Sequence, residues 1–239
     1  MKDVTARLIM AVWLLAASTA GYTETSIGHS TAAPTYMPAR FADGGNSLLD
    51  ALTITEQDPN FSATAFCEAK ATTEGLLKTS QCMVTDWKHM PYKRKVEEAL
   101  NNFSIEPATI NGKPVDVKMK LTVSYFCQQA TCRGVVSLND GQQRDKFGLN
   151  YVSPQLIIYK DNAVQFNRVR NYEPGLKFSI EIMVDEKGSP GDIDVLMVSP
   201  DYKSWVMAIK RHLPREKYIP GIYNAAYTAM PFLYVFWVD

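Results

Sequence analysis

Residues 92–125 read YKRKVEEALNNFSIEPATINGKPVDVKMKLTVSY, and this stretch decides the fold of the first half of the chain. Apolar residues recur at steps of three and four between Tyr92 and Phe103, which predicts a helix with one buried face. A loop with two prolines and one glycine follows over residues 106–114. From Val115 to Tyr125 apolar and polar residues alternate, which predicts a strand with one buried face and one solvated face.

Two further strands are expected before this helix. Residues 63–72 and 76–84 each have the alternation and composition of a strand, and Thr73-Glu74-Gly75 between them predicts a tight turn. The unit expected over residues 62–132 therefore runs strand, strand, helix, strand.

The same order of elements recurs near the C-terminus, over residues 174–239. Strands are expected at 176–184, 193–198 and 232–238, with a helix at 201–213 that ends before a proline. Met83 corresponds to Met197 and Pro107 to Pro220, at differences of 114 and 113 residues. A nearly constant difference favours an internal duplication over a coincidence of two generic patterns.

The region between the two units, residues 133–173, is expected to form a β insertion or connector. Its segments 155–159 and 163–169 flank Lys160-Asp161-Asn162, which favours a hairpin, and Asn139-Asp140-Gly141 predicts an earlier turn. The expected fold class is therefore α+β, with two β-β-α-β units and an extra β-hairpin insertion between them.

The first twenty residues have the pattern of an export signal peptide. Lys2 and Arg7 precede an apolar run from Leu8 to Ala17, and small residues end at Ala20, where cleavage is expected. A membrane-spanning helix needs about 20 apolar residues, so an uncleaved inner-membrane anchor is the alternative rather than the expectation. Residues 21–61 are rich in Thr, Ala, Gly and Ser and are expected to form a flexible lead-in with at most one short helix.

The four cysteines of an exported chain predict two disulfides. Cys67 and Cys82 lie symmetrically about Glu74-Gly75, so they face each other if those residues form the tip of a hairpin. Cys127 and Cys132 are close enough in sequence to close a short loop. We expect the pairs 67–82 and 127–132, with buried free thiols or a zinc site as alternatives. No histidine stands at ligand spacing beside these cysteines.

Composition and motifs exclude several classes of function. Lys plus Arg and Asp plus Glu each number 25, so the formal net charge is zero, whereas nucleic-acid binding requires a clear basic excess. The chain has no Gly-x-Ser-x-Gly, His-Glu-x-x-His or Gly-x-Gly-x-x-Gly motif. We therefore expect no enzymatic activity, cofactor or metal, and keep a small hydrolase with an unrecognised site as an alternative.

Residues 96–115, VEEALNNFSIEPATINGKPV, resemble the C-terminal domain of the TonB family. The family pattern joins a helix ending in an aromatic residue to a Pro-Ala step and to Asn-Gly-x-Pro-Val before the last strand. The resemblance covers residues 62–127, while the second unit is divergent and has Asn224-Ala225-Ala226 in place of Asn-Gly-x-Pro-Val. The matching loop residues are Pro107, Ala108, Asn111, Gly112 and Pro114.

The resemblance implies a periplasmic protein that binds an extended segment of an envelope protein, such as an outer-membrane receptor. Such a segment would pair with an exposed edge strand, whose backbone donors and acceptors are vacant. The candidate edge is the strand at 115–125, unless the 133–172 insertion fills it. An anchored energy transducer, and a homodimer through the apolar strand 232–238, are alternatives. The expected partner-binding residues are Val115, Val117, Lys118, Met119, Lys120, Leu121 and Val123.

Overall fold

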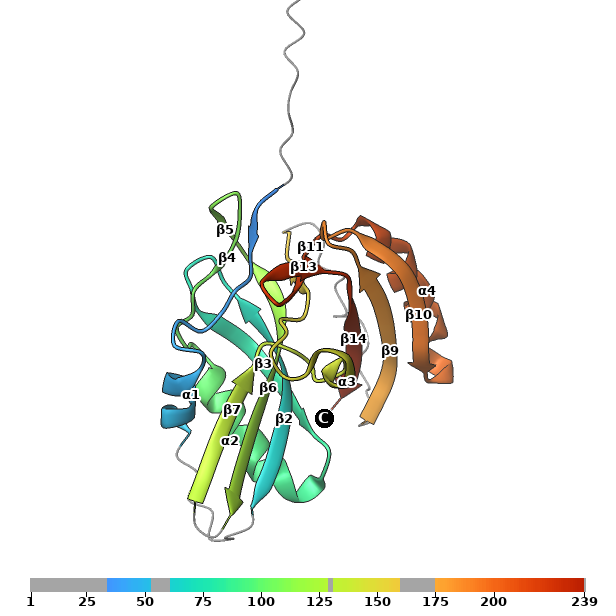
Figure 1. The fold of residues 1–239 in the computed structure, drawn as a ribbon. Helices are drawn as coiled ribbons and strands as arrows, with labels where there is room; N and C mark the ends of the chain where they lie inside the picture. The colour runs from blue at the N-terminus through green and yellow to red at the C-terminus, as the bar shows by residue number, and fades with distance from the viewer. Residues whose placement is uncertain (1–33, 53–60, 129–130, 160–174, 239) are drawn as a thin grey trace, which may run out of the picture. The chain divides into compact units, whose positions relative to one another are not determined.

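The computed structural model describes residues 34–52, 61–128, 131–159 and 175–238. These residues form a mixed α+β fold with mostly antiparallel strands in several sheets, so the expected α+β class is confirmed (Figure 1). The expected signal peptide at 1–20 and the hairpin arm at 163–169 lie outside the described residues. No described helix combines the length and the apolar character that crossing a bilayer requires.

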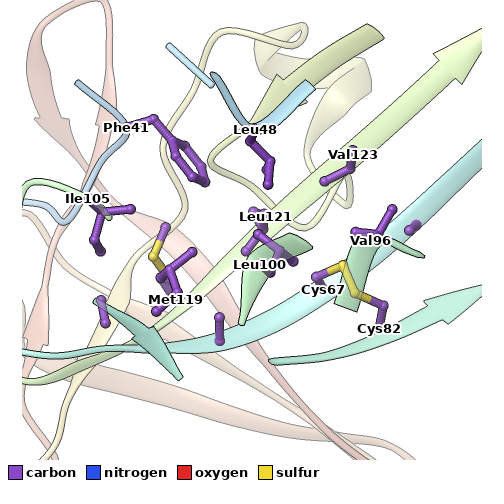
Figure 2. Packing of buried hydrophobic residues seen from close by; sticks show 14 of the residues in the cluster. Phe41, Leu48, Cys67, Cys82, Val96, Leu100, Ile105, Met119, Leu121 and Val123 are labelled. Atoms are coloured by element: carbon purple, nitrogen blue, oxygen red, sulfur yellow. A yellow bond between two sulfur atoms is a disulfide. The ribbon is translucent and has the colours of Figure 1, made fainter. Parts of the chain in front are cut away.

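The first repeat, residues 34–128, is built on three antiparallel strands and one helix. They are β2 (Ser62–Ala71), β3 (Leu77–Val84), α2 (Met90–Leu100) and β6 (Val117–Gln128), with strand order β3-β2-β6. Alternate side chains of β2 and β6 pack with one stripe of α2, as the period-two and period-3.6 patterns predict. Figure 2 shows Val96, Leu100, Leu121 and Val123 in this core.

The second repeat, residues 151–238, has the same order of elements. They are β9 (Gly175–Val184), β10 (Pro190–Val198), α4 (Lys203–His212) and β14 (Met230–Val238), with strand order β10-β9-β14. This repeat has a separate core, to which Ile180, Ile182 and Ile209 contribute. The strands and helices expected at 176–184, 193–198, 201–213 and 232–238 are therefore confirmed to within a few residues.

Equivalent residues of the two repeats differ by 113 in number. Ala71 pairs with Val117 where β2 meets β6, and Val184 pairs with Met230 where β9 meets β14. Gly75 and Gly188 both have a φ of 74° in the turn after the first strand. A Cβ atom there would lie 2.7 Å and 2.1 Å, respectively, from the backbone oxygen of a neighbouring segment, so only glycine fits at either turn.

A β-bulge explains why Met83 and Met197, near the end of the second strand of each unit, differ by 114 rather than 113. In β10 the register shifts between Val195 and Met197, in addition to a shift that both repeats share near the turn. The bulged residue, Leu196, is 57% exposed. A bulge adds one extra residue to one strand of a pair. In the first repeat Val84 pairs with Ala65. In the second repeat Phe178, the equivalent of Ala65, pairs with Val198 rather than with Met197.

Residues 34–52 contain the one short helix that was expected, but they are packed into the fold and are not a flexible lead-in. They contain β1 (Tyr36–Met37) and α1 (Asn46–Ala51), and β1 pairs with β4 (Ala108–Ile110). Phe41 and Leu48 are buried in the first core, as Figure 2 shows. The few apolar residues of this segment gain their burial from partners more than fifty residues away, which local periodicity does not register.

The second repeat also begins earlier than expected, inside the region assigned to the insertion. Met37 pairs with Thr109 in the first repeat, and Val152 forms a bridge to Ile222, the equivalent of Thr109, in the second. The rest of that region forms β7 (Thr131–Ser137), the Asn139-Asp140-Gly141 turn, α3 (Arg144–Phe147) and β8 (Gln155–Ile157).

The remaining elements are short connections. The helices α2 and α4 are each preceded by one turn of 3-10 helix, and β6 and β14 are each preceded by a two-stranded hairpin. These elements are η1 (Trp87–His89), η2 (Pro200–Tyr202), η3 (Leu213–Arg215), β5 (Lys113–Val115), β11 (Tyr218–Ile219), β12 (Gly221–Tyr223) and β13 (Ala226–Thr228).

Both predicted disulfides are confirmed. Cys67–Cys82 joins directly opposite residues of β2 and β3, and Cys127–Cys132 joins opposite residues of β6 and β7, each with a Cα–Cα distance of 4.0 Å. No cysteine remains as a free thiol. Disulfides form and persist in oxidising surroundings, so the chain belongs to a compartment outside the cytoplasm.

Candidate functional site

The strand predicted as the vacant edge, β6, lies in the interior of a sheet. β2 pairs with it along one side from Val117 to Phe126. On the other side β7 pairs with Thr122–Gln128, and β8 pairs with Val117 and Lys118. The expectation that β6 is a vacant edge is therefore wrong, and the alternative holds, in which the 133–172 region pairs with this strand.

The physical reason lies in the short loop after β6. The Cys127–Cys132 disulfide closes a hairpin, so the chain reverses at once and β7 returns along β6. β8 then adds at the start of β6 and is paired in turn with β11 of the second repeat. Strand addition requires vacant backbone groups, and these two strands use most of those that β6 has.

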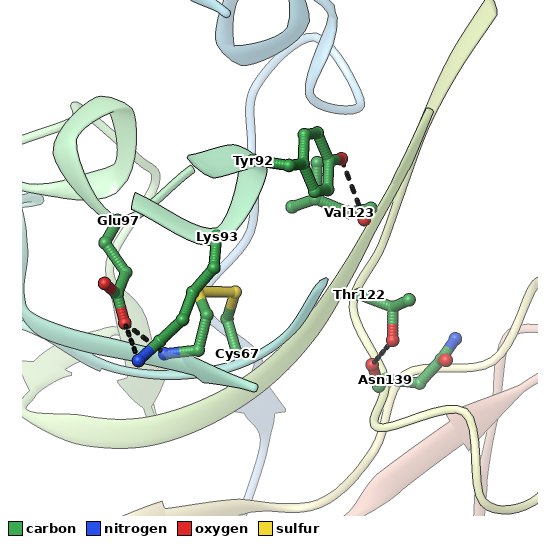
Figure 3. The surroundings of a disulfide bond; sticks show 8 residues. Cys67, Tyr92, Lys93, Glu97, Thr122, Val123 and Asn139 are labelled. Atoms are coloured by element: carbon green, nitrogen blue, oxygen red, sulfur yellow. Dashed lines mark hydrogen bonds and ion pairs between the residues drawn. A yellow bond between two sulfur atoms is a disulfide. The ribbon is translucent and has the colours of Figure 1, made fainter. Parts of the chain in front are cut away.

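The side chains expected to contact a partner are also engaged within the fold. Val117, Met119, Leu121 and Val123 are completely buried, and Val115 ends β5 opposite Ala108. The other face of β6 was predicted to be solvated, but the structure covers much of it. Lys120 is 7% exposed and Thr122 is 9% exposed, and Thr122 donates to the backbone oxygen of Asn139 at 2.7 Å (Figure 3).

Lys118 and Lys120 form ion pairs with one carboxylate, that of Glu68 on β2. Glu68 Oε1 lies 2.6 Å from Lys118 Nζ, and Glu68 Oε2 contacts Lys120 Nζ. Burial raises the pKa of Glu68, but the attraction and hydrogen bonds of Lys120 and Lys118 outweigh it, and the pKa falls from 4.5 to about 2. Lys120 also lies 5.5 Å from the ring centre of Phe232, on β14. These charges therefore stabilise the fold rather than mark a docking surface.

The loop residues that carry the TonB resemblance lie in or next to the β4–β5 hairpin. Ala108 is fully buried in β4, and Pro114 pairs with Thr109 across the β4–β5 hairpin. Asn111 and Gly112 form its two-residue turn with φ values of 51° and 74°, and positive φ at both positions is the type I′ geometry that Asn-Gly favours. Pro107 precedes the hairpin, next to the turn at Gly75.

β14 is the strand of the second repeat that corresponds to β6, and its surroundings differ. It pairs along its whole length with β9 on one side. Within the described residues, no strand and no backbone hydrogen bond occupies its other side. The same structural position is therefore filled in one repeat and vacant in the described part of the other. The repeat of elements predicted from the sequence, combined with a hairpin-closing disulfide in the first unit only, was the signal for this contrast.

The strands at the opposite edges of the two sheets, β3 and β10, differ as well. On β3 the backbone N–H of Cys82 donates to Glu97 Oε1 of α2 at 2.7 Å (Figure 3). A carboxylate on the helix thus satisfies one donor of that edge. The equivalent of Glu97 in α4 is Lys210. A lysine side chain has no acceptor atom, so it cannot accept a hydrogen bond from a backbone N–H of β10. The two repeats therefore differ in the protection of both edges.

The described residues contain no cluster of three or more His, Cys, Asp or Glu side chains that could hold a metal ion. Comparison of the chain with models of protein families, with curated proteins and with solved structures gives no significant match. The resemblance to the TonB family therefore continues to depend on the residues quoted above.

Proposed function

We propose that this chain is an exported, non-enzymatic binding protein that takes up an extended peptide segment along the outer side of β14. The observation that carries the proposal is the contrast between the repeats: β7 and β8 complete the edge of β6, whereas β14 has no counterpart to them among the described residues.

The chemistry of β14 suits strand addition. Its outer N–H and C=O groups offer an incoming strand the ladder that β6 gives to β7. Phe232 is buried in the second core, while Leu233 and Val235 on the other face are half-buried and remain within reach of a ligand. Pro231 lacks a backbone N–H, and proline within a sheet is found on edge strands. The occupant is therefore an extended segment that pairs mainly with residues 232–238.

The disulfides, the signal pattern and the resemblance support the compartment and the class of partner that we propose. The disulfides indicate an oxidising compartment, and the signal pattern at 1–20 supports export to the periplasm with cleavage after Ala20. The shared β-β-α-β order supports two TonB-like units, the second divergent. The partner is then a segment of an envelope protein, such as an outer-membrane receptor. N-terminal sequencing of the exported protein tests whether the signal peptide is cleaved, since an intact Met1 supports the anchored energy transducer instead.

Site-specific photo-crosslinking in the envelope tests the proposed edge. A photoreactive side chain at Leu233 or Val235 of β14 should capture one partner protein, identified by mass spectrometry. The matched control is Met207 of α4, which is 55% exposed but lies on a helix. Equal capture at Met207 and β14, or no capture at β14, overturns strand addition there. Capture of a second copy of the chain supports the homodimer instead.

A further inference from the structure

The first repeat exposes an indole beside a basic helix. Trp87, in η1, is 82% exposed, which is the highest value among the exposed large apolar side chains of the described residues. It lines an open hollow of about 500 Å3 together with Lys88, Met90, Pro91 and Arg94. Exposed tryptophan flanked by arginine is characteristic of residues that dominate protein-binding energies.

The fold does not require these side chains. The equivalent of Trp87 in the second repeat is Pro200 of η2, and the equivalent of Arg94 is Met207 of α4. Both repeats form the 3-10 turn and the helix with these different residues. The indole is too exposed to contribute much to the core, and it lies beside Met90 and Pro91 rather than as an isolated apolar side chain.

The charges around the hollow differ in how they are satisfied. Lys88 Nζ lies 3.1 Å from Asp86 Oδ2, so Lys88 has an acidic partner at the surface. Arg94 is exposed and has no hydrogen bond or ion pair with any described residue. A guanidinium without a partner presents a fork of donors that matches a carboxylate in a bidentate manner.

We propose that this hollow binds an acidic peptide segment in which a carboxylate pairs with Arg94 and a neighbouring aromatic or proline side chain packs on Trp87, Met90 and Pro91. A membrane surface fits less well. Anionic lipid attracts clusters of about four to eight cations, whereas here one arginine is uncompensated. This surface belongs to the first repeat and is independent of the edge of β14.

Titration of the folded, oxidised protein with a defined probe tests the proposal. The probe is the capped peptide Ac-Glu-Glu-Phe-Pro-Glu-Glu-amide, and its counterpart has glutamine in place of each glutamate. Calorimetry should detect saturable binding of the acidic peptide below about 5 mM. Binding of the glutamine peptide should be at least about tenfold weaker, because the charge-assisted bonds to Arg94 are lost.

Variants locate the site. Trp87→Ala and Arg94→Ala should each weaken binding of the acidic peptide by about tenfold or more, and Met207→Ala, the equivalent position of the second repeat, should leave it unchanged. All three side chains are exposed, so unchanged thermal midpoints will show that the variants fold. Crosslinking at β14 should be unaffected by Arg94→Ala, which separates this proposal from the proposed function.

Three results overturn the proposal. The first is the absence of saturable binding of the acidic peptide. The second is equal binding of the two peptides, or of the acidic peptide by wild type and Arg94→Ala. The third is Trp87-dependent binding to vesicles of phosphatidylcholine and phosphatidylglycerol without binding of the peptide, which assigns the surface to a membrane.

Discussion

Replacing Gln155 with methionine should destabilise the protein, because this side chain joins the starting segments of the two repeats. Gln155 is 1% exposed, in β8. Its Oε1 accepts from the backbone N–H of Ala39 at 2.8 Å, and its Nε2 donates to the backbone oxygen of Ala39 at 2.9 Å. The amide thus acts as a strand partner for a fully buried residue of the first repeat. Methionine keeps the length of the side chain and removes both hydrogen bonds.

The size of the effect follows from the two backbone groups left behind. A buried polar group without a partner costs about 1–3 kcal/mol, and Gln155→Met leaves two at Ala39. Some relaxation is expected, so the free energy of unfolding should fall by about 3 kcal/mol. For a protein of this size the thermal midpoint should then fall by about 6–12 °C.

Urea denaturation with the disulfides intact measures this effect, and Gln142→Met, at an exposed position, is the control. Hydrogen exchange at the Ala39 amide gives a local readout, since its protection should be lost before that of β2. If Gln155→Met differs from wild type by less than about 0.5 kcal/mol, as surface substitutions do, the reasoning is refuted and residues 34–52 are not an integral part of the fold.

Three further predictions concern charge, backbone strain and the β6–β7 hairpin. The pKa of Glu68 lies at about 2 in the folded state, below its usual 4.5. Its ion pairs therefore contribute up to about 3 kcal/mol to the free energy of unfolding above pH 5, and this contribution is lost as the pH falls towards 2. In urea denaturation, the stability difference between wild type and Glu68→Gln should shrink on acidification, and a pH-independent difference contradicts this. Ala225→Gly should raise stability by about 1 kcal/mol, because Ala225 has a φ of 60°, while Gly112→Ala at the equivalent turn should lower it; a rise for neither or both in thermal melts would exclude strain as the cause. Replacing Cys127 and Cys132 by serine should cost about 2 kcal/mol and speed hydrogen exchange in β7 but not in β2, and uniform acceleration would argue against a local effect.

Patterns within short segments predicted most of the elements. Alternation at 63–72 and 115–125 gave β2 and β6, and the helical stripe from Tyr92 to Phe103 gave α2 to within a few residues. The symmetry of Cys67 and Cys82 about the turn predicted their pairing. Each of these depends on residues close in sequence, where the period of the side chains determines which face is buried.

The state of the strand edges could not be read in the same way. Alternation shows which face of β6 is buried but carries no information on what pairs beside it. Lys120 illustrates the error: it alternates correctly out of the first core, yet Glu68 and Phe232, 52 and 112 positions away, bury it. The expected loop closed by Cys127–Cys132 implied that the next segment would return along β6. That inference would have corrected the expectation of a vacant edge at β6.

The distribution of the disulfides has a consequence for oxidative folding. All four cysteines lie between residues 67 and 132, and each pairs with its nearest neighbour along the chain. Ile180 and Val195 stand opposite each other in the second repeat where Cys67 and Cys82 stand in the first. An oxidase that joins thiols in their order of emergence during secretion would thus make both native bonds directly. Maturation should need no disulfide isomerase, and a reductant should loosen the N-terminal half first.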